Sequence, residues 1–193
     1  MSLHQTLTGR HITLEPMTEA HKAGLRAACD ADPDTWIELY PFPMYGEHFE
    51  IRWARTMAGV ETRAYLPFAV IHAGEVVGLS GYITPDERNR TVEIGFTYYR
   101  PEARGGAVNP EAKRLLLANA FDHGFDRLQL KVDAINARSR AAVLKLGATF
   151  EGIMRHDRVV WTGRIRDTAV YSILADEWPA VRDRLDARLA AYA

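Results

Sequence analysis

One stretch of the chain, residues 91–135, reads as a strand, a glycine turn, a helix and a second strand in succession. The segment TVEIGFTYY, which begins at Thr91, is typical of a strand, and so is RLQLKVDAI, which ends at Ile135. Between them, RPEARGGAVNPEAK opens a helix that is expected to end before Gly124. Two strands joined through a helix in this way pair in parallel, with a right-handed connection. The stretch therefore predicts one parallel strand pair with a helix on its face.

The rest of the chain supplies strands that are joined mainly by hairpins. An alternating segment ends at Pro16, a hairpin turns at Ala73-Gly74, and a last hairpin turns at Thr162-Gly163. With the helical segments, the expected order is strand, helices, three strands, helix, strand, helix, two strands and helix. We therefore predict the α/β class, with a mixed sheet whose faces carry helices, in a single domain spanning residues 1–193.

Composition and charge exclude several classes of partner. The 47% of hydrophobic residues suffice for a buried core, and the formal net charge of -1 argues against binding nucleic acid or an anionic membrane. No apolar run reaches the roughly 18 residues that a membrane span requires. Cys29 is the only cysteine, which predicts a buried thiol, no internal disulfide and a cytoplasmic location. The histidines lack metal-ligand spacing, so no metal site is expected.

The glycine turn in front of the predicted helix has the features of an anion site. Asn109 is a preferred N-cap, Pro110 suits the first helical position, and the N–H groups at a helix start carry roughly half a positive charge. Gly105 and Gly106 allow a ligand to approach the backbone, and the guanidinium before them suits phosphate. The same residues also fit a plain loop that caps a helix. The spacing matches neither a P-loop nor a dinucleotide fingerprint.

The chain from Gly9 to Leu185 resembles the GNAT-fold N-acetyltransferases, in the branch of the ribosomal-protein N-terminal acetyltransferases. The signature turn of that fold is Gln/Arg-x-x-Gly-x-Gly/Ala. Here Arg104 holds the first position, and Ala107 and Asn109 replace the two small residues. The segments VEIGF, NPEAK, DAINARSRAAVLKLGATFEG and GRIRDTAVYSIL resemble the family in the same order.

This resemblance implies a central, mostly antiparallel sheet that splays at a coenzyme A site, and acetyl-CoA as cosubstrate. It also implies three groups of cosubstrate-binding residues. The strand residues whose main chain would face the thioester and pantetheine are Gly95, Phe96 and Thr97. Those that would hold the diphosphate are Arg104, Gly105, Gly106, Ala107, Val108 and Asn109. Those at the start of the following helix are Asn136 and Ser139.

The resemblance further implies direct attack of a primary amine on the thioester, with no covalent enzyme intermediate. Glu93 is the candidate base, acting directly or through a water, and alternation places it on the same strand face as Gly95 and Thr97. The alternative for Glu93 is a solvated carboxylate on a strand. Many relatives carry a tyrosine acid where Val143 stands here, so Ser139 is the candidate that assists the leaving thiolate.

Aromatic residues gather in one short segment that borders the acceptor channel in this fold. They are Trp36, Tyr40, Phe42 and Tyr45, followed by Phe49. The alternative is that at least three of these five pack the first helices onto the sheet. At pH 7, deprotonation costs about 1 kcal/mol for a terminal α-amine and about 4.6 kcal/mol for a free lysine. An unassisted carboxylate therefore suits an α-amine, such as the N-terminus of a peptide or protein.

Two other functions fit the same residues. The altered glycine turn and the missing tyrosine fit a non-catalytic module that binds or senses acyl-CoA. An acetyltransferase for small molecules, such as antibiotics, polyamines or amino acids, is the other alternative. A homodimer formed through the last hairpin or the terminal helix is a further expectation.

Overall fold

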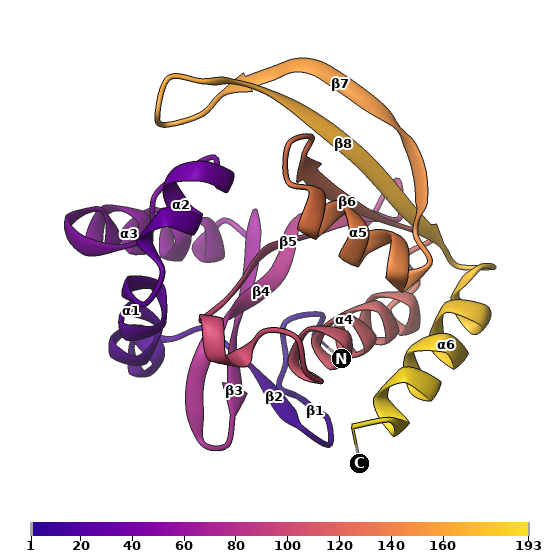
Figure 1. Cartoon of the computed structure of the whole chain (residues 1–193). Coiled ribbons are helices and arrows are strands. Elements are labelled where there is room, and N and C mark those ends of the chain that lie inside the picture. Colours follow the sequence, from indigo (N-terminus) through magenta and orange to yellow (C-terminus); the bar gives the residue numbers. More distant parts are fainter. Residues whose placement is uncertain (1, 193) are drawn as a thin grey trace.

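The computed structural model describes residues 2–192 and contains one eight-stranded sheet in the order β1-β2-β3-β4-β5-β6-β8-β7 (Figure 1). The strands are β1 Leu7–Thr8, β2 Ile12–Pro16, β3 Tyr65–His72, β4 Glu75–Asp86, β5 Thr91–Tyr99, β6 Arg127–Asp133, β7 Thr149–Val159 and β8 Ile165–Leu174. All neighbours pair antiparallel except β5 and β6. The mixed sheet and its one parallel crossover confirm the predicted fold class.

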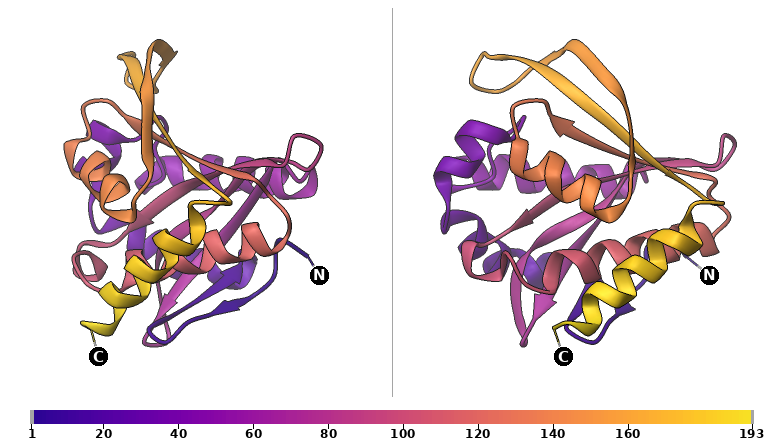
Figure 2. Two further views of the ribbon diagram at one scale, coloured as in Figure 1. Left: turned by 90° about the vertical axis from the view of Figure 1, so that its right-hand side faces the viewer. Right: turned by 45° about the vertical axis from the view of Figure 1, so that its right-hand side comes forward.

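In the described part of the chain, six α-helices cover the sheet: α1 Lys22–Asp30, α2 Pro33–Leu39, α3 Phe49–Glu61, α4 Val108–Asp122, α5 Ala137–Leu146 and α6 Trp178–Ala190. Helices α1 to α3 lie on one side of the sheet and α4 to α6 on the other (Figure 1). Helix α6 runs beside α4 (Figure 2), where Arg114 pairs with Asp186 at 2.8 Å. Two separate hydrophobic cores result, one on each face of the sheet.

The parallel pairing of β5 and β6 is short. It joins Thr91 to Arg127, Val92 to Leu128 and Glu93 to Gln129, and it stops there although both strands continue. Beyond Glu93 the two strands diverge, because β5 keeps its partner β4 while β6 keeps its partner β8. The predicted splay of the sheet is therefore present, and it begins next to the candidate base.

The start of α4 differs from the expected one. Its N-cap is Ala107 and its first residue is Val108, so Asn109 lies within the first turn instead of capping it. Pro110 is consequently the third helical residue, which the helix tolerates because the first four N–H groups have no intrahelical acceptor. The prediction of an Asn109 cap was wrong by two residues, whereas the glycine turn before the helix is present.

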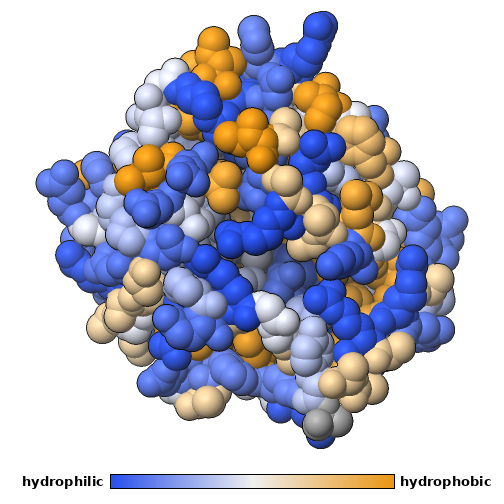
Figure 3. Space-filling model, in the orientation of Figure 1, coloured by the Kyte–Doolittle hydropathy of each residue, from blue (hydrophilic) through white to orange (hydrophobic). Residues whose placement is uncertain are grey.

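The β7–β8 hairpin projects from the body of the sheet (Figure 1) and carries exposed apolar side chains. Ile153, Met154, Val159 and Ile165 are each at least 40% exposed. Figure 3 shows apolar side chains toward its upper edge, where this hairpin lies, on a surface that is otherwise largely polar. This agrees with the homodimer expected through the last hairpin, which stays a prediction.

Within residues 2–192, every helix is too short or too polar to cross a bilayer. In the same part of the chain, no three His, Cys, Asp or Glu side chains gather in a way that could hold a metal ion. Cys29 is buried and free, as predicted.

Candidate active site

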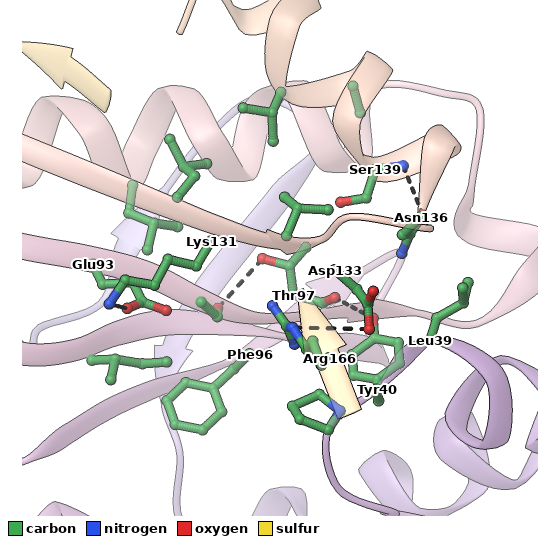
Figure 4. A pocket seen from close by; sticks show the side chains of 18 of the residues that line it. Leu39, Tyr40, Glu93, Phe96, Thr97, Lys131, Asp133, Asn136, Ser139 and Arg166 are labelled. Carbon is green, nitrogen blue, oxygen red and sulfur yellow. Dashed lines mark hydrogen bonds and ion pairs between the residues drawn. The ribbon is translucent and has the colours of Figure 1, made fainter. Parts of the chain in front are cut away.

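A cavity of about 200 Å³ lies where β5 and β6 diverge. It is enclosed by the two strands, by α4 and α5, and by the segment that follows α2 (Figure 4). The predicted site residues that line it are Tyr40, Phe42, Glu93, Gly95, Phe96, Thr97, Asn109, Asn136 and Ser139. Those that lie outside its lining are Trp36, Tyr45, Arg104, Gly105, Gly106, Ala107 and Val108. The predicted strand residues and the start of α5 thus meet at one cavity, whereas only Asn109 of the predicted diphosphate turn reaches it.

A β-bulge shapes the cavity side of β5. Gly81 pairs with Gly95 and Leu79 pairs with Tyr98, so β5 has one more residue between these pairs than β4 has. The left-handed residue of the bulge is Phe96, with φ of 58°. Gly95, which was expected to permit the bulge, is not its left-handed residue, although Ile83 would have to move to make room for a side chain there. A Cβ there would lie 2.4 Å from Cδ1 of Ile83.

The bulge reverses which side chains share a face of β5. Glu93 and Gly95 point away from α4, because the intervening Ile94 packs in the core beneath that helix. After the bulge, Thr97 points toward α4, where its Oγ1 lies 2.9 Å from Oγ of Ser80. The expectation that Thr97 shares a face with Glu93 was therefore wrong, because it assumed unbroken alternation.

Glu93 is held at the cavity wall by an ion pair. Its Oε2 lies 2.9 Å from Nζ of Lys131, which projects from β6 across the gap (Figure 4). The Glu93 side chain is 17% exposed, so it keeps access to the cavity. The solvated-carboxylate alternative does not describe this environment, because the group is mostly enclosed and paired.

The aromatic segment divides between the cavity and the core. Tyr40 donates its hydroxyl hydrogen bond to the carbonyl oxygen of Thr97, and burial raises the pKa of Tyr40, so that this phenol stays protonated. Phe42 also lines the cavity. Trp36, Tyr45 and Phe49 pack in or against the core between α1–α3 and the sheet, as the packing alternative for three of the five stated.

Trp36 does not line the cavity and packs in the core next to it. Its ring is buried and stacks on Tyr98 with centroids 4.4 Å apart, and its Nε1 donates to the carbonyl oxygen of Cys29 at 3.1 Å. Tyr45 packs its ring edge-on against His48 at 5.7 Å. The structure therefore places both residues outside the predicted acceptor channel.

The N-terminus of α4 offers unpaired backbone donors. Among residues 2–192, the N–H groups of Val108 and Asn109 have no hydrogen-bond acceptor. Gly105 adopts φ of 83°, and a Cβ at Gly105 or at Gly106 would meet no atom within 4 Å. The turn is therefore open on the side from which an anion can approach the backbone, as a diphosphate would require.

Arg104 is engaged with protein groups. Its Nη1 lies 2.6 Å from Oδ2 of Asp32, and its Nε donates to the carbonyl oxygen of Tyr99 at 2.7 Å. These bonds fasten the glycine turn to the start of α2. Its Nη2 is buried and has no partner among residues 2–192, so Arg104 contributes its positive charge to the turn and exposes no free donor at Nη2.

Asn136 caps α5 and also lines the cavity. Its Oδ1 accepts a hydrogen bond from the N–H of Ser139 at 2.9 Å, so Asn136 is the N-cap of α5. Because this cap fixes the first turn of α5, the Ser139 side chain is held at the cavity wall (Figure 4).

Sequence reasoning missed Lys113 of α4. This lysine is only 4% exposed, lines the cavity, and donates to Oγ of Ser80 at 3.1 Å and to Oγ1 of Thr97 at 2.5 Å. Burial lowers its pKa to about 7. Its spacing of three and four residues from Leu116 and Leu117, both buried, is the helical periodicity that would have placed it on the inner face.

Other charged residues at the cavity were also missed. Asp133, at the end of β6, lies 2.5 Å from Nη2 of Arg164 and 3.8 Å from Nε of Arg166. Arg166 lies in β8 and Arg164 directly precedes that strand. Asp133 and Arg166 line the cavity.

Comparison with known proteins gives the same family. Residues 11–149 match the profile of the acetyltransferase (GNAT) domain. A GCN5-related N-acetyltransferase from Brucella melitensis is 31% identical, with a TM-score of 0.88 over 96% of this chain and 86% of that one. An acetyltransferase structure from T. thermophilus is 33% identical, with a TM-score of 0.86 over 98% of this chain and 99% of that one. No curated protein matches the sequence significantly.

More distant structures share the fold and hold coenzyme A. Mycobacterium smegmatis RimJ, in complex with CoA-disulfide, is 22% identical, with a TM-score of 0.80 over 97% of this chain and 92% of that one. The Microcin C7 self-immunity acetyltransferase MccE was solved with acetyl-CoA and AMP. The splayed strands, the open helix start and these matches agree: the chain belongs to the GNAT acetyltransferase family and is an acetyl-CoA-dependent N-acetyltransferase.

Proposed function

We propose that the enzyme acetylates a primary α-amine at the N-terminus of a peptide or protein, by direct attack in a ternary complex with acetyl-CoA. The observation that carries the proposal is the cavity that opens directly beyond Glu93, between β5 and β6. It brings a carboxylate, a bulged strand and the starts of two helices to one place. The distant fold relatives RimJ and RimL, the latter a ribosomal L7/L12 alpha-N-protein acetyltransferase, support the same class.

In this proposal, acetyl-CoA lies along the path that runs from the helix start to the cavity. The diphosphate meets the amides of Gly105 to Asn109, and the positive charge of Arg104 lies next to that turn. The pantetheine and thioester lie along Gly95 to Thr97, where the bulge turns main-chain groups away from the regular ladder. Asn136 and Ser139 line the cavity at the start of α5, and in this proposal Ser139 is the donor to the sulfur.

The acceptor class follows from the limited help that the site gives to deprotonation. A terminal α-amine at pH 7 needs about 1 kcal/mol to become neutral, and a lysine needs about 4.6 kcal/mol. Glu93, whose carboxylate is already paired with Lys131, is suited to deprotonating an α-amine, which costs less than deprotonating a lysine. Phe42 and Tyr40 line the side of the cavity where the acceptor would enter.

Replacing Glu93 with glutamine is expected to lower kcat about tenfold at pH 7, while the Kd for coenzyme A changes less than threefold. The loss is modest because the carboxylate only removes a proton that an α-amine gives up easily. It should shrink near pH 9, where the amine is already neutral. Steady-state kinetics and calorimetry measure the two quantities, and an unchanged kcat at pH 7 would reject the role of Glu93.

The function itself is tested by free-thiol release from acetyl-CoA with a panel of peptides, amino acids, polyamines and aminoglycosides. Peptides with a free N-terminus should release thiol, and the same peptides blocked at the N-terminus should not. Coenzyme A binding without thiol release across the panel would support the sensing module instead. Release with only the small amines would support the small-molecule acetyltransferase.

A further inference from the structure

Lys113 is a buried lysine that forms no ion pair with any residue the structure describes. Among residues 2–192, no carboxylate lies within 4.0 Å of its Nζ, whereas the other cavity lysine, Lys131, is paired with Glu93. A buried charge without a partner is costly, and an apolar side chain at this position would avoid that cost. The reaction requires a proton transfer that this lysine can perform.

The hydrogen bonds around Nζ leave one position free. The hydroxyls of Ser80 and Thr97 lie within reach of the carbonyl oxygen of Gly95, at 3.5 and 3.3 Å, so their hydrogens have an acceptor. Both oxygens can therefore accept from Lys113, which lies 3.1 Å from Ser80 and 2.5 Å from Thr97. A neutral amine has two N–H donors and one lone pair. With both donors used, the lone pair is left for a group in the cavity.

Acetylation of an ammonium group releases two protons, at different moments. The first leaves before attack, because only the neutral amine is a nucleophile. The second leaves the same nitrogen as the C–N bond forms and the C–S bond breaks, and the departing thiolate takes up one proton. Glu93 and Lys113 line the same cavity from opposite faces of β5, so a separate base is available for each proton.

We propose that Lys113 carries the second proton, from the nitrogen that becomes the amide to the sulfur that leaves. This assignment rests on the acetyl transfer proposed above. The lone pair of Nζ accepts the proton, the side chain becomes an ammonium held by Ser80 and Thr97, and it then protonates the thiolate. Lys113 ends neutral, the products are the amide and the thiol, and the first proton leaves through Glu93.

The electrostatic surroundings suit a group that both accepts and returns a proton. Burial lowers the pKa of Lys113 to about 7, so both forms are populated near neutral pH. The neutral form is the active base, and therefore kcat should rise as the pH increases through about 7. The other titratable groups around the cavity either form hydrogen bonds or ion pairs with other residues or stay neutral, so none of them pairs with Lys113. They are Tyr82, Tyr99, Glu111, Tyr40, Glu93 with Lys131, and Asp133 with Arg164 and Arg166.

The test replaces Lys113 with methionine, which keeps the length and the burial but has no lone pair of comparable basicity. We expect kcat to fall about 30-fold, because water can take over part of the transfer, with the Kd for coenzyme A within threefold of the wild-type value. Lys113→Arg should lose activity to a similar degree, because a guanidinium stays protonated. Lys145→Met, an exposed lysine on α5, is the matched control and should keep full activity.

The pH profile separates Lys113 from Glu93. The defect of Glu93→Gln should shrink at pH 9, whereas the defect of Lys113→Met should persist, because the second proton must leave at any pH. The rise of kcat that is centred near pH 7 should be lost in Lys113→Met, which should keep only the rise at about pH 7.8 that comes from deprotonation of the acceptor α-amine. Thermal unfolding should show that Lys113→Met is at least as stable as the wild type, since it removes a buried amine.

A readout without turnover completes the test. Nitrogen-15 NMR of the lysine side chains should show Lys113 titrating near pH 7 in the wild-type protein. A midpoint near 10, or a kcat of Lys113→Met within threefold of wild type, would overturn the proposal for Lys113 alone. Absence of thiol release by the wild type with every amine would overturn the proposed function, and this proposal with it.

Discussion

Replacing Glu111 with alanine is expected to lower the free energy of unfolding by about 4 kcal/mol. Its carboxylate lies in the first turn of α4, is 5% exposed, and accepts hydrogen bonds from the backbone N–H groups of Arg10, His11 and Ile12 at 2.7 to 2.8 Å. Each bond to a charged acceptor contributes about 1.5 kcal/mol or more. Alanine would leave three N–H groups without an acceptor, the one of Ile12 in a buried position.

Urea unfolding followed by circular dichroism measures this effect. Glu111→Gln should lower the free energy of unfolding by about half as much, because one amide oxygen can still accept hydrogen bonds. Glu38→Ala, at an exposed position of α2, is the matched control and should change stability by less than about 0.5 kcal/mol. Equal unfolding midpoints for Glu111→Ala and Glu38→Ala would contradict the anchoring role. Because this anchor ties the β1–β2 turn to the start of α4, the variant should also bind coenzyme A more weakly.

Replacing Gly106 with aspartate is expected to weaken coenzyme A binding about 100-fold without lowering thermal stability. A side chain fits there, since a Cβ would meet no atom within 4 Å and the backbone is not in the left-handed region. A carboxylate next to a doubly charged diphosphate costs about 3 kcal/mol in a partly solvated site. The same carboxylate interacts favourably with the helix start, so the unfolding temperature should stay equal or rise slightly.

Calorimetric titration at fixed salt gives the Kd, and Gly106→Ala is the steric control. It should bind coenzyme A within threefold of wild type. Raising the salt concentration should reduce the defect of the aspartate variant, because the repulsion is screened. A Kd for Gly106→Asp equal to that of Gly106→Ala would place the diphosphate elsewhere. Gly105 is unsuitable for this comparison, because its φ of 83° would strain any side chain.

The cavity shows which features of the site could be predicted from residue patterns and which could not. Periodicity identified β5, α4 and β6, and the parallel connection between them, because each element has its own repeat of buried residues. The side-chain directions on β5 followed that repeat only as far as Gly95. One extra residue at Phe96 then turned Thr97 to the opposite face, and no local signal in GFTYY marks that residue as the left-handed one.

The partners of the charged residues could not be predicted from sequence spacing either. Arg104 was identified as an anion ligand from its position, but the structure pairs it with Asp32, which is 72 residues away. Glu93 was identified as a base, and its pairing with Lys131 depends on a register between two strands. Sequence spacing could not supply these pairs, because they join elements whose relative placement is set by the core.

The order of elements, the single parallel crossover, the glycine turn and the family of the chain could all be predicted from the amino-acid sequence. These depend on local periodicity and on short motifs, which each segment carries independently. The tertiary structure alone decided the face of Thr97, the partner of Arg104 and the burial of Lys113. Those features arise only when β4, β5, α4 and the start of α2 pack together, because burial and ion pairing depend on neighbours distant in the chain.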